Sequence, residues 1–278
     1  MLVDSHSHFD AAEFDADRAA VHARALAAGV RRQVVPAVDA AGWPKLKSVC
    51  AEFSGLFPAY GMHPMYLDAH RPEHLAELRH WIERERPVAL GECGLDHFIE
   101  DLDVEAQHLY FDGQLRLARE FDLPVIVHAR RAVDAVIASI RKVGGLRGVV
   151  HSFSGSAEQA AQLHKLGFLL GIGGPVTYER ANRLRGMVAT MPLDQLLLET
   201  DSPDQPDADH RGERNEPAHL PNVLRVIAEL RGMPAAELAI ATSANAERLF
   251  KLPPAIKPAS ASTTSPAPSP PPQTRTHR

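Results

Sequence analysis

Six side chains that suit metal binding follow short apolar runs of this sequence. They are four histidines and two carboxylates: His6, His8, Glu92, His128, His151 and Asp201. Each comes at the end of a run that predicts a buried strand, directly before a loop or a helix start. Neutral imidazole and carboxylate are the ligands that zinc, manganese and similar divalent ions take in proteins. Six such residues on one face of a sheet would form a two-metal hydrolytic centre.

His6 and His8 lie two residues apart in the segment V-D-S-H-S-H. Side chains of a strand repeat every two residues, so both imidazoles are expected on the same side. Asp4 shares that face one step earlier and could brace the pair. A polar strand end exposed to water would give the same pattern, so the two histidines indicate a metal site only together with the others.

Glu92 stands inside an otherwise apolar strand, between V-A-L-G and C-G-L-D. An unpaired carboxylate there would be costly, so it needs a cation, an arginine or backbone donors. A central glutamate can bridge two cations with its two oxygens. Gly91 and Gly94 would allow close packing or an unusual backbone turn around it. Cys93 is expected on the opposite face, and Asp96 either supports the site or caps the next turn.

His128 and His151 each close a valine-rich run, and Asp201 closes L-L-L-E-T-D. A single histidine in such a place is commonly a hydrogen-bonded core residue. Two of them at the same level of neighbouring strands favour coordination. Glu199 shares the face of Asp201 one layer deeper, so we expect Asp201 to be the ligand and Glu199 to support it.

Strand-like and helix-like segments alternate along the chain. The expected strands are residues 2–4, 33–36, 56–60, 88–91, 125–127, 148–150, 168–172 and 195–199. Helical patterns include residues 16–28, 72–86, 105–121, 132–143, 157–166, 179–190, 217–231 and 235–241. This alternation predicts parallel strands joined by right-handed crossovers, and eight units predict a (β/α)8 TIM barrel of the α/β class. The six candidate ligands would lie at C-terminal strand ends, where such barrels carry their active sites.

Composition places the chain among ordinary soluble enzymes. Its 278 residues are 45% hydrophobic, and its net charge of −5 includes no polycationic block that would grip long nucleic acids. Two cysteines exclude a disulfide scaffold and fit a reducing compartment. No signal-peptide pattern and no membrane-length apolar run occur, so we expect a cytoplasmic protein without a membrane partner.

The composition changes near Leu252. Residues 1–252 are expected to form the barrel domain. Residues 253–278 are rich in Pro, Ser, Ala and Thr and have little to bury, which predicts a disordered tail.

The motifs resemble those of TatD-family metal-dependent hydrolases, deoxyribonucleases within the amidohydrolase-type barrels, from Leu2 to about Leu252. The matching segments are V-D-S-H-S-H-F-D (3–10), G-M-H-P (61–64), G-E-C-G-L-D (91–96), L-P-V-I-V-H-A-R-R (123–131), H-S-F-S-G-S (151–156), L-L-L-E-T-D-S-P (196–203) and R-N-E-P (214–217). One departure is His97, which stands where family members often carry an aromatic residue.

The resemblance implies a two-metal site that is divided between two sets of ligands. One ion would be held by His6, His8, Glu92 and Asp201, and the other by Glu92, His128 and His151. Glu92 would bridge the two ions. The implied activity is metal-dependent hydrolysis of DNA, typically exonucleolytic, although some relatives have other hydrolytic roles.

A mechanism follows from such a site. Two divalent ions (zinc, magnesium, manganese or similar) would lower the pKa of a water and give a hydroxide that attacks a phosphodiester. Asp201 and Glu92 are the expected catalytic residues, with Asp201 orienting the water and accepting its proton. Arg130 is expected to bind phosphate because guanidinium matches its oxygens. His63 and His210 are further candidates for substrate binding, and each could equally have a structural role in its loop.

Three functions agree with these residues. The first is a 3'-5' exonuclease-like deoxyribonuclease acting on short or terminal single-stranded DNA. The second is a two-metal barrel hydrolase for an ester, a lactone or an aminoacyl ester. The third is a non-catalytic metal-bound interaction protein, whose expected mark is a missing ligand, and none of the six is missing. The sequence does not separate the first two, because the same hydroxide would attack either substrate.

Overall fold

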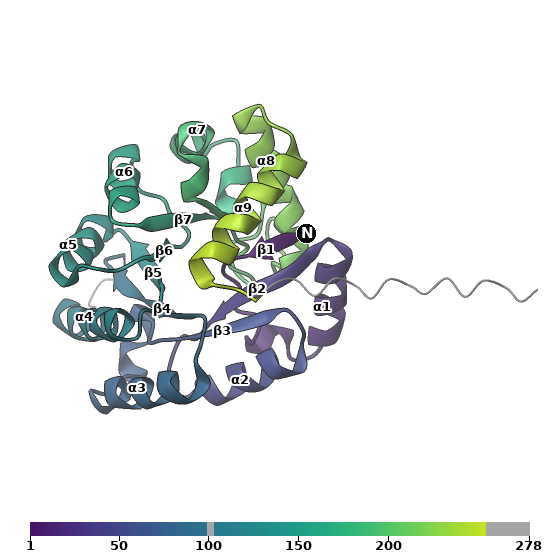
Figure 1. Cartoon of the computed structure of the whole chain (residues 1–278). Coiled ribbons are helices and arrows are strands. Elements are labelled where there is room, and N and C mark those ends of the chain that lie inside the picture. The colour runs from purple at the N-terminus through teal and green to yellow at the C-terminus, as the bar shows by residue number, and fades with distance from the viewer. Residues whose placement is uncertain (99–102, 254–278) are drawn as a thin grey trace, which may run out of the picture.

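Eight parallel strands form the centre of the molecule, and helices surround them (Figure 1). The computed structural model describes residues 1–98 and 103–253. The strands are β1 (Leu2–Asp4), β2 (Val30–Pro36), β3 (Leu56–Tyr60), β4 (Ala89–Asp96), β5 (Val125–Arg130), β6 (Gly148–Val150), β7 (Phe168–Ile172) and β8 (Leu196–Leu198). Each pairs with the next in sequence order. The backbone N–H of Ser5 donates to the carbonyl of Leu198 at 2.9 Å, which brings the last strand against the first. The predicted TIM barrel is confirmed.

Nine α-helices occur in the described part of the chain. They are α1 (Arg18–Ala27), α2 (Trp43–Glu52), α3 (Glu73–Glu85), α4 (Val104–Glu120), α5 (Val133–Val143), α6 (Ala157–Lys165), α7 (Asn182–Thr190), α8 (Leu220–Arg231) and α9 (Ala235–Phe250). The sequence pattern did not identify α2, and it ended α9 nine residues too early. None of the helices described is long and apolar enough to cross a membrane.

The inside of the barrel is closed at one end by α9, which lies across the strands in Figure 1. Its buried residues Ala246, Leu249 and Phe250 join an inner core of small and branched side chains. That inner core comes from seven strands: Val3, Val34, Ala59, Ala89, Ile126, Val149 and Leu197. The amide of Asn245 also donates to the carbonyl of Leu196 at 2.9 Å, so α9 is hydrogen-bonded to β8. Apolar residues fill this end of the barrel. The polar residues of the candidate site lie at the other end, where the strands have their C-termini.

Strand β4 is irregular where it carries Glu92. Its pairing with β5 shifts register between Leu90 and Cys93, as in a β-bulge, which re-aims a side chain. Gly94 has φ +150, and a Cβ there would lie 2.0 Å from the carbonyl oxygen of His128. The glycine therefore lets the two strands approach where any larger residue would collide. Cys93 is fully buried in the outer apolar core, as expected for the face opposite Glu92.

The chain continues past the barrel beyond the described residues. Leu252 is still largely buried, and the carbonyl of Pro253 accepts a hydrogen bond from Arg32 at 2.7 Å. The tail predicted for residues 253–278 lies, apart from Pro253, outside the described residues.

Candidate metal centre

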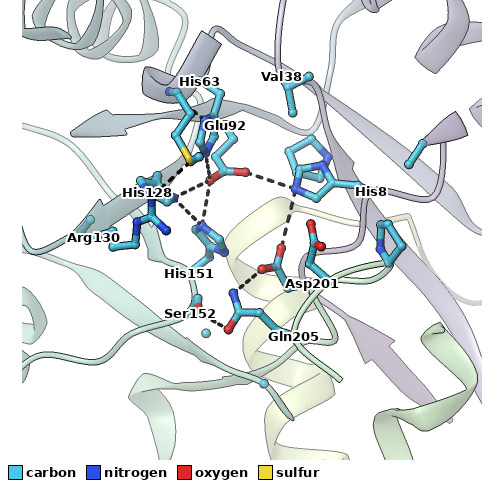
Figure 2. Close-up of a pocket in the computed structure, with 18 of the residues that line it drawn as sticks. His8, Val38, His63, Glu92, His128, Arg130, His151, Ser152, Asp201 and Gln205 are labelled. Atoms are coloured by element: carbon cyan, nitrogen blue, oxygen red, sulfur yellow. Dashed lines mark hydrogen bonds and ion pairs between the residues drawn. The ribbon is translucent and has the colours of Figure 1, made fainter. Parts of the chain in front are cut away.

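The six predicted ligands meet at the C-terminal end of the barrel around Glu92, as Figure 2 shows for five of them. They line or adjoin a cavity of about 820 Å³. Glu92 comes from within β4 and His128 from within β5, whereas the others lie one to four residues after the ends of β1, β6 and β8. Short strands that end at the same level therefore deliver residues far apart in sequence to one place.

The two carboxylate oxygens of Glu92 face two different groups of side chains. Oε2 lies 3.1 Å from Nε2 of His6 and 3.5 Å from Nε2 of His8. Oε1 lies 2.8 Å from Nε2 of His151 and 3.2 Å from Nδ1 of His128. This division is the geometry that a bridging carboxylate requires.

The first group consists of His6, His8, Glu92 and Asp201. Nε2 of His6 lies 3.2 Å from Nε2 of His8 and 3.4 Å from Oδ1 of Asp201. The corresponding distance from His8 to Asp201 is 3.6 Å. In a tetrahedral zinc site with bonds of about 2 Å the ligand atoms lie roughly 3.3 Å apart, and these five distances are close to that value. The donor atoms therefore fit one divalent ion.

The second group consists of Glu92, His128 and His151. Nε2 of His128 lies 2.8 Å from Oδ2 of Asp96, to which it donates, so the lone pair of His128 is on Nδ1. That Nδ1 lies 3.3 Å from Nε2 of His151. A carboxylate that orients an imidazole in this way is a common companion of metal-binding histidines. Three converging acceptors fit a second cation with open positions for water or substrate.

The electrostatics of Glu92 agree with cation binding. Burial alone would raise its pKa, but the imidazoles of His151, His63 and His6 hold the pKa of Glu92 well below the usual glutamate value. The carboxylate is therefore ionised. Among the described residues, its buried Oε2 has no hydrogen-bond partner. An ionised buried oxygen without a donor is strongly disfavoured unless a cation compensates it, so the site fits metal ions.

His63 lies inside this centre rather than at its rim. Its Nδ1 accepts a hydrogen bond from the backbone N–H of Met65 at 3.1 Å, and burial lowers its pKa to about 4. The neutral ring must then carry its proton on Nε2, which lies 2.9 Å from Oε1 of Glu92. His63 therefore donates to Glu92, and because it also lines the cavity its contact with substrate stays a prediction.

Asp4 and Glu199 hold the ends of the strands that carry the ligands. Asp4 accepts from the backbone N–H of His6 at 3.2 Å and from the hydroxyl of Thr200 at 2.6 Å. Glu199 accepts from the backbone N–H of Ser152 at 2.5 Å. Both carboxylates lie beside the ligands, which agrees with the supporting positions expected for them.

Arg130 lies at the edge of the cavity, and Asp96 and Phe98 hold its side chain in place. Its Nε donates to Oδ2 of Asp96 at 2.8 Å, and its guanidinium lies over the ring of Phe98 at 4.4 Å. Asp96 is buried, yet the hydrogen bonds from His128 and Arg130 help to hold its pKa at about 2 against the effect of burial. Of the terminal nitrogens of Arg130, Nη2 donates to the thioether sulfur of Met65 at 3.7 Å, and the side chain lines the cavity.

His210 is not among the residues that line the cavity. Its Nδ1 lies 3.0 Å from Oδ1 of Asp207, and its ring stacks on that of His219 at a centroid distance of 3.5 Å. Asn215 is also structural, because its amide donates to the carbonyls of Thr200 and Asp204, both at 2.8 Å. The loop after β8 therefore uses these side chains for its own packing.

Two residues of the site were assigned no role from the sequence. Gln205 donates to Oδ2 of Asp201, and Ser152 donates its hydroxyl to Oε1 of Gln205 at 2.8 Å. Both lie in loops, where no periodicity indicates which way a side chain points. Only the place of Ser152, directly after His151, could have drawn attention to it.

Comparisons with known proteins point to one family. The model of the family "TatD related DNase" matches residues 3–251. The uncharacterized metal-dependent hydrolase YjjV of Escherichia coli is 41% identical over 256 residues, which covers 91% of this chain and 98% of that protein. The 3'-5' ssDNA/RNA exonuclease TatD of Cronobacter sakazakii is 35% identical over 90% of this chain and 97% of its own.

The solved structures lead to the same family. The crystal structure of E. coli YjjV, a TatD homologue, superposes with a TM-score of 0.86 at 39% identity and covers 91% of this chain and 98% of that one. A TatD-family hydrolase from Entamoeba histolytica matches with a TM-score of 0.79 at 19% identity over 89% and 97% of the two chains, which shows the shared fold. The chain belongs to the TatD family of metal-dependent hydrolases.

Proposed function

We propose that this protein is a deoxyribonuclease that removes nucleotides from single-stranded DNA ends in the 3'-5' direction with two divalent ions. The observation that carries the proposal is the division of the two Glu92 oxygens between two groups of ligands. The exonuclease named among its relatives supports the choice of a nucleic acid as substrate.

His6, His8, Glu92 and Asp201 would hold one ion, and Glu92, His128 and His151 the other. When bound, two divalent ions lower the pKa of a water toward neutrality and offset negative charge on a phosphoryl oxygen. Asp201 is the residue that accepts the proton of that water. Burial raises the pKa of Asp201, which makes its carboxylate a better base, and its Oδ1 faces the first group.

Arg130 would bind the non-bridging oxygens of the phosphate. Its Nε is fixed by Asp96, so the terminal guanidinium nitrogens are held in place at the cavity edge before substrate arrives. A planar guanidinium matches two phosphate oxygens at once. The same Asp96 orients His128, so one carboxylate aligns a metal ligand with a substrate-binding residue.

The charge of the cavity supports action at chain ends. Asp10, Glu13 and Asp204 line it together with Arg130. A polyanion that crossed the whole cavity would pass these carboxylates and be repelled by them. A terminal nucleotide presents less charge to them than a continuous strand does, so we propose short or terminal single strands as substrates.

The test is an assay of purified protein reconstituted with Mn²⁺, Mg²⁺ or Zn²⁺. Single-stranded and duplex DNA labelled at the 5' end are compared with a panel of esters and lactones. We expect a ladder of shortened 5'-labelled single strands and release of mononucleotides, and no activity in Asp201→Asn. Hydrolysis of an ester or lactone without any nucleotide release would contradict the proposal.

A further inference from the structure

The side chain of Gln205 connects two loops at the mouth of the barrel (Figure 2). Its Nε2 donates to Oδ2 of Asp201, and its Oε1 accepts from the hydroxyl of Ser152 at 2.8 Å. Asp201 follows β8 and Ser152 follows β6, with β7 between them in the barrel. A single amide therefore links loops that are not neighbours.

The orientation of this amide follows from the chemistry of its partners. An ionised carboxylate only accepts hydrogen bonds, so the NH₂ group of Gln205 must face Asp201. Its carbonyl oxygen then points toward Ser152, whose hydroxyl can donate. Both ends of the side chain are satisfied in this orientation, and turning the amide over would leave the carboxylate facing an oxygen.

This contact determines which oxygen of Asp201 reaches the candidate metal centre. Oδ2 is occupied by Gln205, and Oδ1 lies 3.4 Å from Nε2 of His6 and 3.6 Å from Nε2 of His8. The carboxylate thus presents one oxygen to the first group of ligands. Without the amide it would be free to turn about its Cβ–Cγ bond.

The same three residues share an uncommon backbone conformation. Ser152, Asp201 and Gln205 have positive φ angles of 45°, 56° and 50°, although none is glycine. Such conformations persist only where the surrounding structure holds them, and they concentrate at functional sites. The backbone of Gln205 is held closely, because a Cβ on Gly174 would lie 2.2 Å from its carbonyl oxygen.

We propose that Gln205 is a positioning residue that fixes Asp201 as a one-oxygen metal ligand and anchors it to Ser152, the neighbour of His151. It acts on the metal through Asp201 and is not itself a ligand. The inference depends on the metal centre of the proposed function but not on its substrate. It would therefore stand if the protein proved to hydrolyse something other than DNA.

The test is a calorimetric titration of the metal-free protein with Mn²⁺. Gln205→Met keeps the size of the side chain and removes both hydrogen bonds. We expect it to weaken the binding of one ion by roughly 10- to 100-fold, as found when the hydrogen-bond partners of metal ligands are removed. Ser152→Ala should weaken Mn²⁺ binding less, because the hydrogen bond from Gln205 to Asp201 remains. Gln162→Met is the matched control, since the side chain of Gln162 accepts a hydrogen bond from Arg141 on the surface, and it should bind Mn²⁺ like the parent protein.

A double-mutant cycle separates positioning from a general effect on folding. In an Asp201→Asn background the first group keeps three ligands and its weakened Mn²⁺ binding is still measurable. Adding Gln205→Met there should change the affinity by less than about twofold, because the residue through which it acts is already altered. Unchanged Mn²⁺ affinity in Gln205→Met, or an equal loss in both backgrounds, would overturn the inference.

Discussion

Asp96 accepts a hydrogen bond from Nε2 of His128 at 2.8 Å. The contact fixes which nitrogen of His128 carries the proton and turns its Nδ1 toward Glu92 and His151. Asp96 also anchors Nε of Arg130 at 2.8 Å. A residue that touches neither substrate nor metal in our proposal therefore orients both a metal ligand and a phosphate-binding side chain.

The first prediction concerns this contact. Asp96→Ala should weaken metal binding at the second group of ligands by roughly 10- to 100-fold, because His128 loses the partner that fixes its tautomer. The measurement is calorimetric titration of the metal-free protein with Mn²⁺. Asp194→Ala, which removes an exposed carboxylate beside His164, serves as the control. Equal affinities in both variants would show that His128 is oriented by something else.

The strands and the six candidate ligands were predictable because each rests on a short-range pattern. A buried strand produces an apolar run, and a polar residue at its end stands out against that run, as His151 does after G-V-V. Parallel strands then bring their C-terminal ends to the same end of the barrel, regardless of the conformation of the loops. Four strands, among them β1 and β6, begin and end at the residues expected from sequence.

The remaining features depend on contacts between distant segments. Strand β4 continues to Asp96, five residues beyond the expected end. Gly91 and Gly94 were expected to allow close packing, but the length over which β4 pairs with β5 depends on the register of both strands. The place of His63 depends on a loop whose backbone N–H selects its tautomer. His210 stacks on His219, nine residues away, which no periodic pattern indicates.

A second prediction tests the bridge. Glu92→Gln keeps the size of the side chain but removes the negative charge that would offset two cations about 4 Å apart. Metal content should fall from two ions per chain toward one or none, and hydrolysis by several orders of magnitude. Elemental analysis measures the metal content, and circular dichroism checks that the variant is folded. His6→Ala and His151→Ala are the comparisons, and each should empty mainly one of the two positions. Two tightly bound ions in Glu92→Gln would rule out the bridging role.

A third prediction concerns phosphate binding by Arg130. Arg130→Ala should lower kcat/KM for single-stranded DNA by an amount on the order of 2–4 kcal/mol, as for other transition-state donors, and leave metal content intact. Arg131→Ala is the matched control, because Arg131 also lies over Phe98 but is not among the residues that line the metal cavity. If both variants turned over DNA like the parent protein, Arg130 would have no part in the reaction.

The last prediction is a pH dependence of stability that comes from Glu199. Burial raises the pKa of Glu199 from 4.5 to about 8, so the folded protein keeps this carboxyl protonated where the unfolded chain has lost the proton. Its contribution to the free energy of unfolding is therefore complete below about pH 4.5 and is lost as the pH rises through about 8. Glu199→Gln stays neutral and still offers an oxygen to the N–H of Ser152. In metal-free protein, the Tm of Glu199→Gln minus that of the parent should become more positive between pH 5 and pH 9, as measured by calorimetry in a chelating buffer. Parallel curves of Tm against pH would mean that Glu199 ionises alike in the folded and unfolded chain.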